Sequence, residues 1–396
     1  HLSRYQVYKF IDKVEVVDPY TVRFTLKGPL ATFPRRLAMS STQMMCPSLI
    51  KDAKGVEGKK ITAFNACGTG PYKLEFFNPS EKLVVKKNPD YRLKGLPKLD
   101  GITWLPVIEN STRAAMLHTG EAQYAFPMPN EQIASFKNDP KFRIETVPSI
   151  MQRYLSINTT VKPFNDVRVR QAINYAINKQ ALAQVAFAGY AVPTETLYPK
   201  EIPGAVKLGP WPYDPKKARE LLKEAGYPDG FTTDLWSAYA NTTSSKVIQF
   251  IQQQLAQVGI KTRTRMLEPG VRASVVYGVK NPAESGLRLY YVGWADASMD
   301  PDWVLRPLLD SRQAPPKFMN TSYYSNPKLD ELLDKAVATD AARSKLYEEA
   351  QKMVWNDAPW AYLVYEVGTA GADARLVNFT LRPDTGIDFI NAEWKE

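Results

Sequence analysis

Two segments in the second half of the chain place polar side chains directly after an apolar strand pattern. The first pattern ends at Trp236 and continues into residues 237–243, Ser-Ala-Tyr-Ala-Asn-Thr-Thr, before a helical pattern begins. The second ends at Trp294 and continues into residues 295–300, Ala-Asp-Ala-Ser-Met-Asp. In an open α/β sheet, ligands collect beyond the carboxyl ends of strands, where loops carry polar groups and helix N-termini present free N–H donors. Both loops are therefore candidate binding segments.

A purely structural explanation competes with this one. Trp236 and Trp294 could be core aromatics, and Asp296 and Asp300 could be turn formers, and composition alone favours that alternative. Asp300 also stands directly before Pro301, an arrangement typical of a helix N-cap. The residue types alone leave both roles open.

The elements that would position these loops follow from the apolar periodicity after about residue 165. Asp166 can cap one helix, and Asp214 can cap another that ends at Gly226. A third helical pattern stops at Gly259 and is followed by the alternating strand pattern of residues 260–266. Helices that alternate with strands in this way predict an α/β region.

The first third of the chain has a different sequence pattern, which is typical of short strands and turns. Residues 20–27 alternate apolar with polar side chains, and residues 83–87 and 101–105 look similar. The run Gly-Thr-Gly-Pro at 68–71 is a turn signal. It fails as a phosphate loop, because neither a helical pattern nor a Lys-Ser/Thr pair follows it.

Composition excludes several classes of protein. The 396 residues, 44% hydrophobic and 23% charged, describe a folded chain of about two domains and not a disordered one. No stretch approaches the roughly 18 consecutive apolar residues of a membrane helix. The net charge is +10, but Lys and Arg are scattered and form no basic stripe, which argues against nucleic-acid binding. No secretion signal opens the sequence, so we expect any signal to have been removed or to lie outside it.

The chain offers little material for metal or catalytic chemistry. Cys46 and Cys67 lack the spacing of a zinc site, which leaves one disulfide or two free thiols. His1 is at the terminus, and His118 lies in a helical stretch where a surface or partly buried role is expected. We expect no metal and no cofactor, and there is no nucleophile elbow or paired histidine base of an enzyme.

Several motifs occur in a fixed order along the chain. They are Gly68-Thr69-Gly70-Pro71-Tyr72, Asn88-Pro89-Asp90-Tyr91, the run PFNDVRVRQAINYAIN at 163–178, Tyr213-Asp214-Pro215 and Ala225-Gly226-Tyr227-Pro228. In this order and spacing, from about Tyr5 to the end, the chain resembles the solute-binding proteins of peptide-type ABC importers. Within that family, residues 112–117, 148–154 and 187–191 most resemble the members that bind glutathione. The resemblance implies an α/β fold of the two-lobe periplasmic (Venus-flytrap) type, with a ligand cleft between lobes joined by a hinge.

The resemblance also implies how the chain is divided. Residues 1–151 would form a strand-rich remainder of lobe 1, residues 152–367 would form the α/β lobe 2, and residues 368–396 would return to lobe 1. Family members normally begin with a signal and a substantial first part of lobe 1, so we expect that part to exist as a missing segment. An exported, periplasmic protein is implied, in which a disulfide between Cys46 and Cys67 would survive.

At two positions the sequence departs from the family's dipeptide binders. The aspartate that holds a peptide amino group, three residues after the Gly-Trp tryptophan, is replaced by Ala297. The arginine that grips a dipeptide carboxylate, six residues after the Leu-Trp tryptophan, is replaced by Thr242. Both departures are compatible with glutathione, whose γ-linked glutamate carries its α-amine and α-carboxylate on a side branch.

The charges of glutathione define the contacts that its site would need. Two carboxylates and one ammonium require fixed cations or N–H donors and one carboxylate. We expect Arg153 and Arg272 to hold the carboxylates, although either could equally be a solvated surface charge, and Asp296 or Asp300 to meet the ammonium. The aromatic contacts would be Tyr154, Trp236, Tyr239 and Trp294, and the hydrogen-bonding contacts Asn241, Thr242, Ser298 and Asn320.

These expectations describe a binding protein and not an enzyme. It would capture glutathione or a similar short peptide outside the cytoplasm and deliver it to the membrane permease of an ABC transporter, as a monomer apart from the missing segment. Alternatives within the class are another dipeptide or oligopeptide, an opine or a metal chelate. A distant alternative is a hydrolytic enzyme on the same scaffold.

Overall fold

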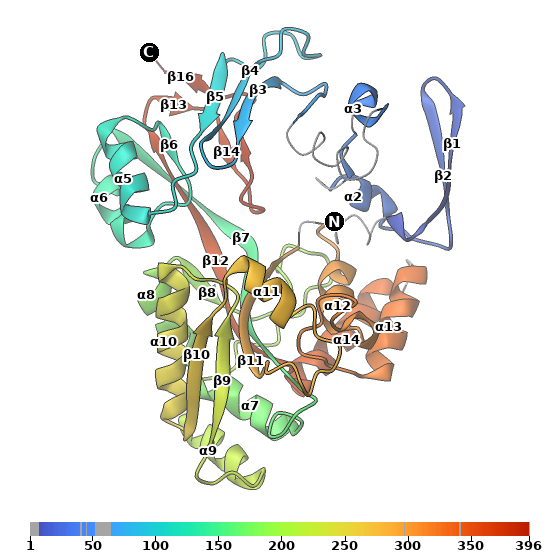
Figure 1. The fold of residues 1–396 in the computed structure, drawn as a ribbon, viewed down its shortest axis with the longest axis vertical. Coiled ribbons are helices and arrows are strands. Elements are labelled where there is room, and N and C mark those ends of the chain that lie inside the picture. The colour runs from blue at the N-terminus through green and yellow to red at the C-terminus, as the bar shows by residue number, and fades with distance from the viewer. Residues whose placement is uncertain are drawn as a thin grey trace. The chain divides into compact units, whose positions relative to one another are not determined.

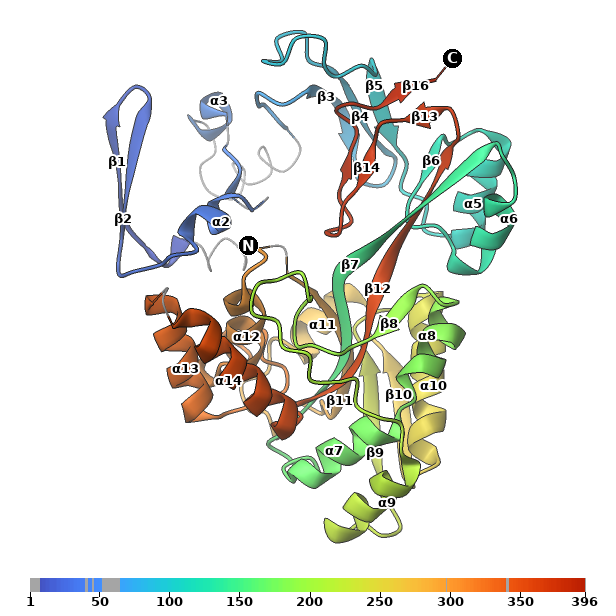
Figure 2. The same cartoon turned by 180° about the vertical axis from the view of Figure 1, so that it is seen from behind.

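The computed structural model describes residues 8–39, 42–44, 46–51, 65–296, 298–339 and 342–395. His1, Tyr5 and Ala297 therefore lie outside the described residues. The chain divides into two units (Figures 1 and 2): unit 1 combines His1–Thr42 with Ile150–Glu366, and unit 2 combines Gln43–Ser149 with Val367–Glu396. The division into two lobes stays a prediction. The units differ from the predicted lobes in that the residues up to Thr42 belong to the same unit as Ile150–Glu366.

Unit 1 is built on a mixed sheet. In spatial order its strands are β10 (Ile260–Met266), β9 (Phe231–Ser237), β11 (Leu289–Ala295), β7 (Phe142–Ile157) and β12 (Trp360–Asp373), with β8 (Ala191–Pro193) paired to β12. β10 and β11 run parallel to β9, and β7 is antiparallel to β11. The strand predicted over residues 260–266 is confirmed as β10. β7 and β12 are long enough to continue into unit 2.

Alternation along these strands sends side chains into two separate cores. In β11, Leu289 and Tyr291 join one core, whereas Tyr290 and Val292 join the other, because successive strand residues point to opposite faces of a sheet. The first core is closed by α7 (Val167–Ala176), α8 (Lys179–Phe187), α9 (Pro215–Glu224) and α10 (Thr242–Ala256). The second is closed by α12 (Pro301–Leu309), α13 (Pro327–Ala338) and α14 (Arg343–Asp357), with α11 (Pro269–Val275) at its margin.

The helices of unit 1 begin and end at the predicted signals. The Asp166 carboxylate accepts a hydrogen bond from the amide of Arg168 at the start of α7, and Asp214 caps α9 in the same way. Gly226 and Gly259, which follow α9 and α10, have φ angles of 91° and 90°. Only glycine adopts this left-handed region at little cost, so both positions end their helices.

Unit 1 also contains the described N-terminal residues. β1 (Ile11–Asp18) and β2 (Thr21–Leu26) form a two-stranded antiparallel sheet, and α2 (Phe33–Leu37) follows it. The strand predicted over residues 20–27 is confirmed as β2.

Unit 2 is assembled from short elements. Its three-stranded antiparallel sheet consists of β3 (Tyr72–Asn78), β4 (Lys82–Lys87) and β5 (Gly101–Trp104), which confirms the two other predicted strands. The short pairs are β13 (Leu376–Val377) with β16 (Glu393–Trp394), β14 (Thr380–Leu381) with β15 (Ile387–Asp388), and β6 (Tyr124–Ala125) with the second half of β12. The helices are α3 (Pro47–Lys51), α5 (Asn110–Thr119), α6 (Ile133–Lys137) and the 3₁₀ turn at Asn130–Gln132, and a second 3₁₀ turn at Ser311–Gln313 belongs to unit 1.

The remaining expectations for single residues of unit 2 are met. Cys46 and Cys67 form a disulfide with their Cα atoms 5.3 Å apart. His118 lies in α5, and its ring contacts those of Phe136 and Phe142 at centroid distances of 6.2 and 5.9 Å. Over the described ranges, no helix is long and apolar enough to cross a membrane, and no group of three or more His, Cys, Asp or Glu residues is arranged to hold a metal ion.

Candidate functional site

The loop that follows β9 is held in shape by its own side chains. The Ser237 hydroxyl donates to the carbonyl of Tyr239 at 2.8 Å and accepts from its amide at 3.1 Å. The side-chain oxygen of Asn241 accepts from the amide of Ser244 at 2.9 Å and so caps α10. Thr242 is the first residue of α10, and both it and Asn241 are exposed. The loop therefore presents Tyr239, Asn241 and Thr242 next to a helix N-terminus.

Arg153 extends from β7 to this loop. Its guanidinium carbon lies 4.6 Å from the ring centroid of Tyr239, and its Nε donates to Oε1 of Glu366 at 2.6 Å. Gly293 is the residue opposite Arg153 on β11, and a Cβ atom there would lie 2.6 Å from Nη1 of the arginine. The amide of Gly293 donates to the Tyr239 hydroxyl at 3.1 Å. A larger residue at position 293 would therefore displace the guanidinium.

The charge on Arg153 is fixed by its surroundings. Burial opposes the charged form, but the Glu366 carboxylate outweighs it and raises the pKa of Arg153 above its usual value. Arg272, in α11, reaches the same region, because its Nη1 donates to the carbonyl of Ala238 at 3.1 Å. The two predicted carboxylate-binding arginines thus both contact the loop after β9.

Asp296 organises the second loop, which follows β11. It is fully buried, and its Oδ1 accepts hydrogen bonds from the amide of Ser298 at 3.1 Å and from its hydroxyl at 3.0 Å. Its Oδ2 is buried without a hydrogen-bond partner in the part of the chain that the structure describes. Burial raises the pKa of Asp296 to about 7, with the Ser298 hydrogen bonds acting against the shift and the charge of Asp300 adding to it. A carboxylate with one unused oxygen therefore lies in this loop.

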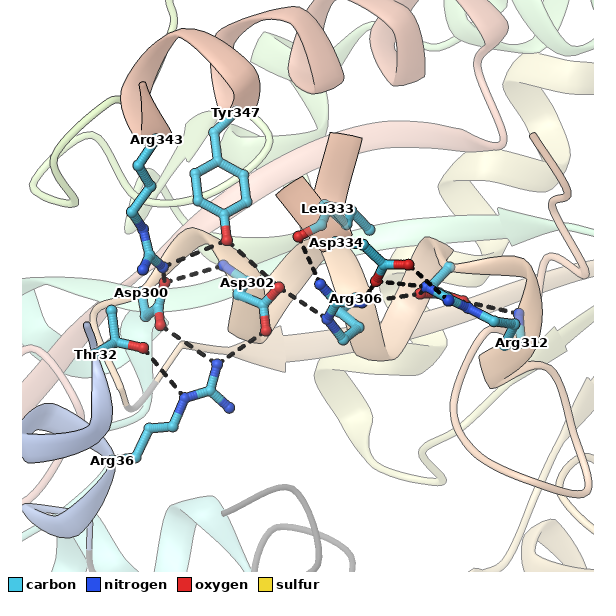
Figure 3. A network of polar contacts seen from close by, with 11 residues as sticks. Thr32, Arg36, Asp300, Asp302, Arg306, Arg312, Leu333, Asp334, Arg343 and Tyr347 are labelled. Atoms are coloured by element: carbon cyan, nitrogen blue, oxygen red, sulfur yellow. Dashed lines mark hydrogen bonds and ion pairs between the residues drawn. The ribbon is translucent and has the colours of Figure 1, made fainter. Parts of the chain in front are cut away.

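Asp300 has a different environment from Asp296. Its Oδ1 accepts from the amide of Asp302 at 3.2 Å, which confirms the alternative role of Asp300 as the N-cap of α12. Figure 3 shows its carboxylate between two cations: Oδ1 is paired with Arg343, and Oδ2 lies 3.5 Å from Nη2 of Arg36. Oδ2 of Asp300, like Oδ2 of Asp296, makes no hydrogen bond within the described residues, but two arginines pair with the Asp300 carboxylate.

Trp294 stands at the end of β11, immediately before this loop. It is half-buried, and its ring centroid lies 6.4 Å from that of Trp303. Its indole Nε1 is buried and makes no hydrogen bond to any residue in the described ranges. Trp294 therefore carries an unused donor two positions before Asp296 in the chain.

Three of the predicted site residues have structural contacts instead. Tyr154 is buried and stacks on Trp360 at 4.2 Å, and Trp236 is buried in the same core with the guanidinium of Arg265 5.2 Å from its ring. The amide of Asn320 is fully used, since its nitrogen donates to the carbonyls of Asp310 and Tyr324 and its oxygen accepts from Ser322 and Tyr324. The carbonyl of Ser322 accepts from Thr159, just past the end of β7 that pairs with the start of β11. Asn320 thus lies at the end of the sheet away from the two loops.

Sequence reasoning missed two important residues of this region. Glu366 is the partner of Arg153, and the signal was available, because it is the single charge in the apolar run 360–367. Arg36 is a buried cation that pairs with Asp300 and Asp302. No sequence pattern near Arg36 identifies it as buried, because its partners are distant in the chain. Asp302 lies 266 positions after it.

Comparison with known proteins places these features in a family. Residues 2–316 match the model of the bacterial extracellular solute-binding proteins, family 5 Middle. The chain is 50% identical over 397 residues to the glutathione-binding protein GsiB of Salmonella choleraesuis, covering 100% of this chain and 76% of that protein. It is 48% identical over 395 residues to the protein of the same name from Escherichia coli O1:K1, covering 99% and 76%.

Solved structures give the same result for the fold. The periplasmic binding protein DppA of Helicobacter pylori, in complex with the peptide STSA, superposes with a TM-score of 0.85 at 29% identity, covering 100% of this chain and 77% of that one. The dipeptide-binding protein of Pseudoalteromonas sp. SM9913, in complex with Met-Leu, gives 0.85 at 23% identity, covering 100% and 78%. The mixed α/β architecture is therefore that of the family 5 peptide-binding proteins.

Proposed function

The chain belongs to family 5 of the bacterial extracellular solute-binding proteins, and on that premise we propose that it captures glutathione and delivers it to the permease of an ABC transporter. Members of this family are extracytoplasmic transport proteins that work with such permeases, and they are not enzymes. We place the protein in the periplasm, as a monomer.

The observation that carries the proposal is a set of buried polar atoms with unused hydrogen-bonding capacity. Nη1 of Arg153, Nε1 of Trp294 and Oδ2 of Asp296 are all buried without a partner among the described residues. The large majority of buried side-chain polar atoms have a partner in folded proteins, so three unsatisfied ones on predicted site residues support a binding site there. Two donors and one carboxylate oxygen match the groups of a zwitterionic peptide.

The two arginines paired with Asp300 support our choice of Asp296 as the partner of the ligand's ammonium. Arg343 and Arg36 already neutralise Asp300, whereas Asp296 has one oxygen free and no cation beside it in the described residues. An ammonium that paired with Asp296 would offset the burial that keeps its pKa high. Arg153 and Arg272 then remain for the two carboxylates, as the charges of glutathione require.

The relatives favour glutathione over an ordinary dipeptide. The relatives that are about 50% identical to this chain over the aligned residues carry the name glutathione-binding protein. Thr242, exposed at the start of α10, stands where the family's dipeptide binders are expected to have an arginine. The carboxylates of the ligand must therefore be held elsewhere, and Arg153 and Arg272 supply the cations.

Isothermal titration calorimetry against reduced glutathione, oxidised glutathione, Met-Leu and a tetrapeptide tests the proposal. We expect glutathione to bind with a Kd of about 1 μM or below, which corresponds to about 8 kcal/mol, and at least about ten-fold more tightly than Met-Leu. Mass spectrometry of solute released from the purified protein should recover it chemically unchanged. Tighter binding of Met-Leu or the tetrapeptide than of either form of glutathione would overturn the assignment.

A further inference from the structure

One arginine near the N-terminus is buried against the helix that follows the Asp296 loop. Arg36, in α2, is 1% exposed. Its Nη2 lies 2.9 Å from Oδ2 of Asp302 and 3.5 Å from Oδ2 of Asp300, and its Nε donates to the hydroxyl of Thr32 at 3.3 Å. A single guanidinium therefore bridges the two carboxylates of the first turn of α12, as Figure 3 shows.

Each of these two carboxylates is also paired with a second arginine, so that arginines and aspartates alternate through the cluster. Asp300 is also paired with Arg343, and Asp302 accepts from Nε of Arg306 at 2.9 Å. Removal of Arg36 would leave both aspartates with one arginine each, in a buried region where an uncompensated charge is costly. The added negative charge would act on Asp296, whose own ionisation is already opposed by Asp300.

Two more contacts join the same N-terminal segment to the loop. Nη1 of Arg35 donates to the carbonyl of Met299 at 3.3 Å, and Met299 has a φ of 51°, in the left-handed region that non-glycine residues seldom adopt. Met39 is buried in a small cluster with Trp303, against which Trp294 also packs. The segment around α2 thus contacts the loop at its backbone, at its capping carboxylate and beside the tryptophan that precedes it.

We propose that Arg36 is a positioning residue of the ligand site, which fixes Asp296 and residues 298–300 without contacting the ligand. The proposal rests on the proposed function, since it concerns the residues assigned to the ligand there. Arg36 would hold the N-cap Asp300, and through it the loop in which Asp296 keeps one oxygen for the ammonium. The segment around α2 then contributes to ligand recognition without contacting the ligand.

The test combines hydrogen exchange with ligand binding in Arg36→Met, Arg36→Lys and the control Arg263→Met. Arg263 is an exposed arginine that pairs with Asp234 on the surface. In Arg36→Met we expect the amides of Ser298 and Asp302, which are hydrogen-bonded to Asp296 and Asp300, to exchange at least about ten-fold faster. Glutathione affinity should fall at least ten-fold, Arg36→Lys should recover part of both effects, and Arg263→Met should change neither.

The outcomes separate this proposal from the proposed function. If the wild-type protein binds no glutathione or peptide, the function fails, whereas the exchange rates still report whether Arg36 holds the loop. A folded Arg36→Met protein with unchanged exchange and unchanged affinity would overturn the positioning role. If Arg36→Met does not fold, Thr32→Val, which removes the acceptor of Nε only, gives the milder test. Faster loop exchange and weaker binding in that variant support the role, and no change in either refutes it.

Discussion

Nε of Arg153 donates to Oε1 of Glu366 at 2.6 Å, which connects neighbouring strands β7 and β12 inside unit 1. Both residues lie close to where the chain passes between units, at Ser149 and Ile150 and at Glu366 and Val367. A buried ion pair is weak evidence for stability, because the desolvation of both charges offsets their attraction, yet the loss of one partner is costly. We therefore interpret Glu366 as the residue that orients Arg153 for a ligand.

Replacement of Arg153 separates ligand binding from stability. In Arg153→Met the partly exposed Glu366 carboxylate loses its partner, and the free energy of unfolding should fall by about 1–2 kcal/mol. The affinity for glutathione should fall at least about ten-fold, because a charge-assisted contact to a carboxylate is lost. Denaturant titration and calorimetry measure the two effects.

The double variant Arg153→Met with Glu366→Gln is the control for that experiment. It removes both charges, so stability should recover toward the wild-type value while affinity stays low. Glutathione binding at wild-type strength in the double variant would contradict a ligand role for Arg153.

The affinity for glutathione should depend on pH through Asp296. Its pKa of about 7 means that only the ionised fraction can pair with an ammonium. Between pH 6 and pH 8 that fraction rises about ten-fold, and we expect the affinity to rise with it. Calorimetry at several pH values, in buffers of matched ionic strength, measures the change. Glutathione acetylated on its amine is the matched ligand control, and Asp296→Asn the matched protein control. Both should bind without this pH dependence, and a slope retained in Asp296→Asn would assign it to another group.

Asp296 should also make the ligand-free protein less stable as pH rises. Its pKa is raised from 3.8 in the unfolded chain to about 7 in the folded one. The folded state therefore binds more protons between these values, and the contribution to stability, complete below about pH 4, is lost as pH rises toward 7. Asp296→Asn should remove this part of the pH dependence of the free energy of unfolding. An unchanged profile in the variant would show that Asp296 has an ordinary pKa in the free protein.

Lys179 should also make the free energy of unfolding depend on pH, but in the opposite direction, so that stability rises with pH. It is buried in α8 and its ammonium donates to the carbonyl of Asn174, and burial lowers its pKa to about 7. The unfolded chain, with an ordinary lysine pKa of 10.5, binds more protons above pH 7, so stability should rise between about pH 7 and pH 10. Lys179→Met should raise the free energy of unfolding at pH 6 by about 2 kcal/mol and flatten that rise. Lys335→Met, at an exposed lysine of α13, should leave both unchanged.

The disulfide should stabilise unit 2. Cys46 and Cys67 are separated by 21 positions, and a loop of that size contributes roughly 3 kcal/mol when it is closed in the unfolded chain. Reduction, or the paired change Cys46→Ser with Cys67→Ser, should therefore speed hydrogen exchange in β3, β4 and β5, which belong to the same unit. Reducing agent should have no effect on the paired variant, and equal protection of these strands with and without the disulfide would exclude a stabilising role.

The elements predicted well from the sequence are those whose signals are local. Asp166 and Asp214 precede helices that they cap with their own side chains, and β10 has the bounds predicted from its alternation. Gly226 and Gly259 end helices because each adopts a positive φ. In all of these cases the residues that determine the structure lie within a few positions of one another.

The site was harder to predict because its contacts are distant in sequence. Arg153 was identified from the charge of an expected ligand, but its contacts with Glu366, Tyr239 and Gly293 depend on strand order. Tyr154 and Trp236 carry hydrogen-bonding groups and follow the strand pattern, yet alternation turns both into the core that α12 to α14 cover. Single residue types cannot distinguish these environments before the sheet is assembled.

The strand order of unit 1 also determines when the protein can fold during its synthesis. β12 is the neighbour of β7 and begins at Trp360, so the sheet is incomplete until the ribosome has passed that residue. Arg36 leaves the ribosome long before Asp302, from which 266 positions separate it. During that interval apolar side chains that the finished sheet buries, such as Leu155 and Tyr291, lack part of their core. The nascent chain should therefore bind holding chaperones until its last strands emerge.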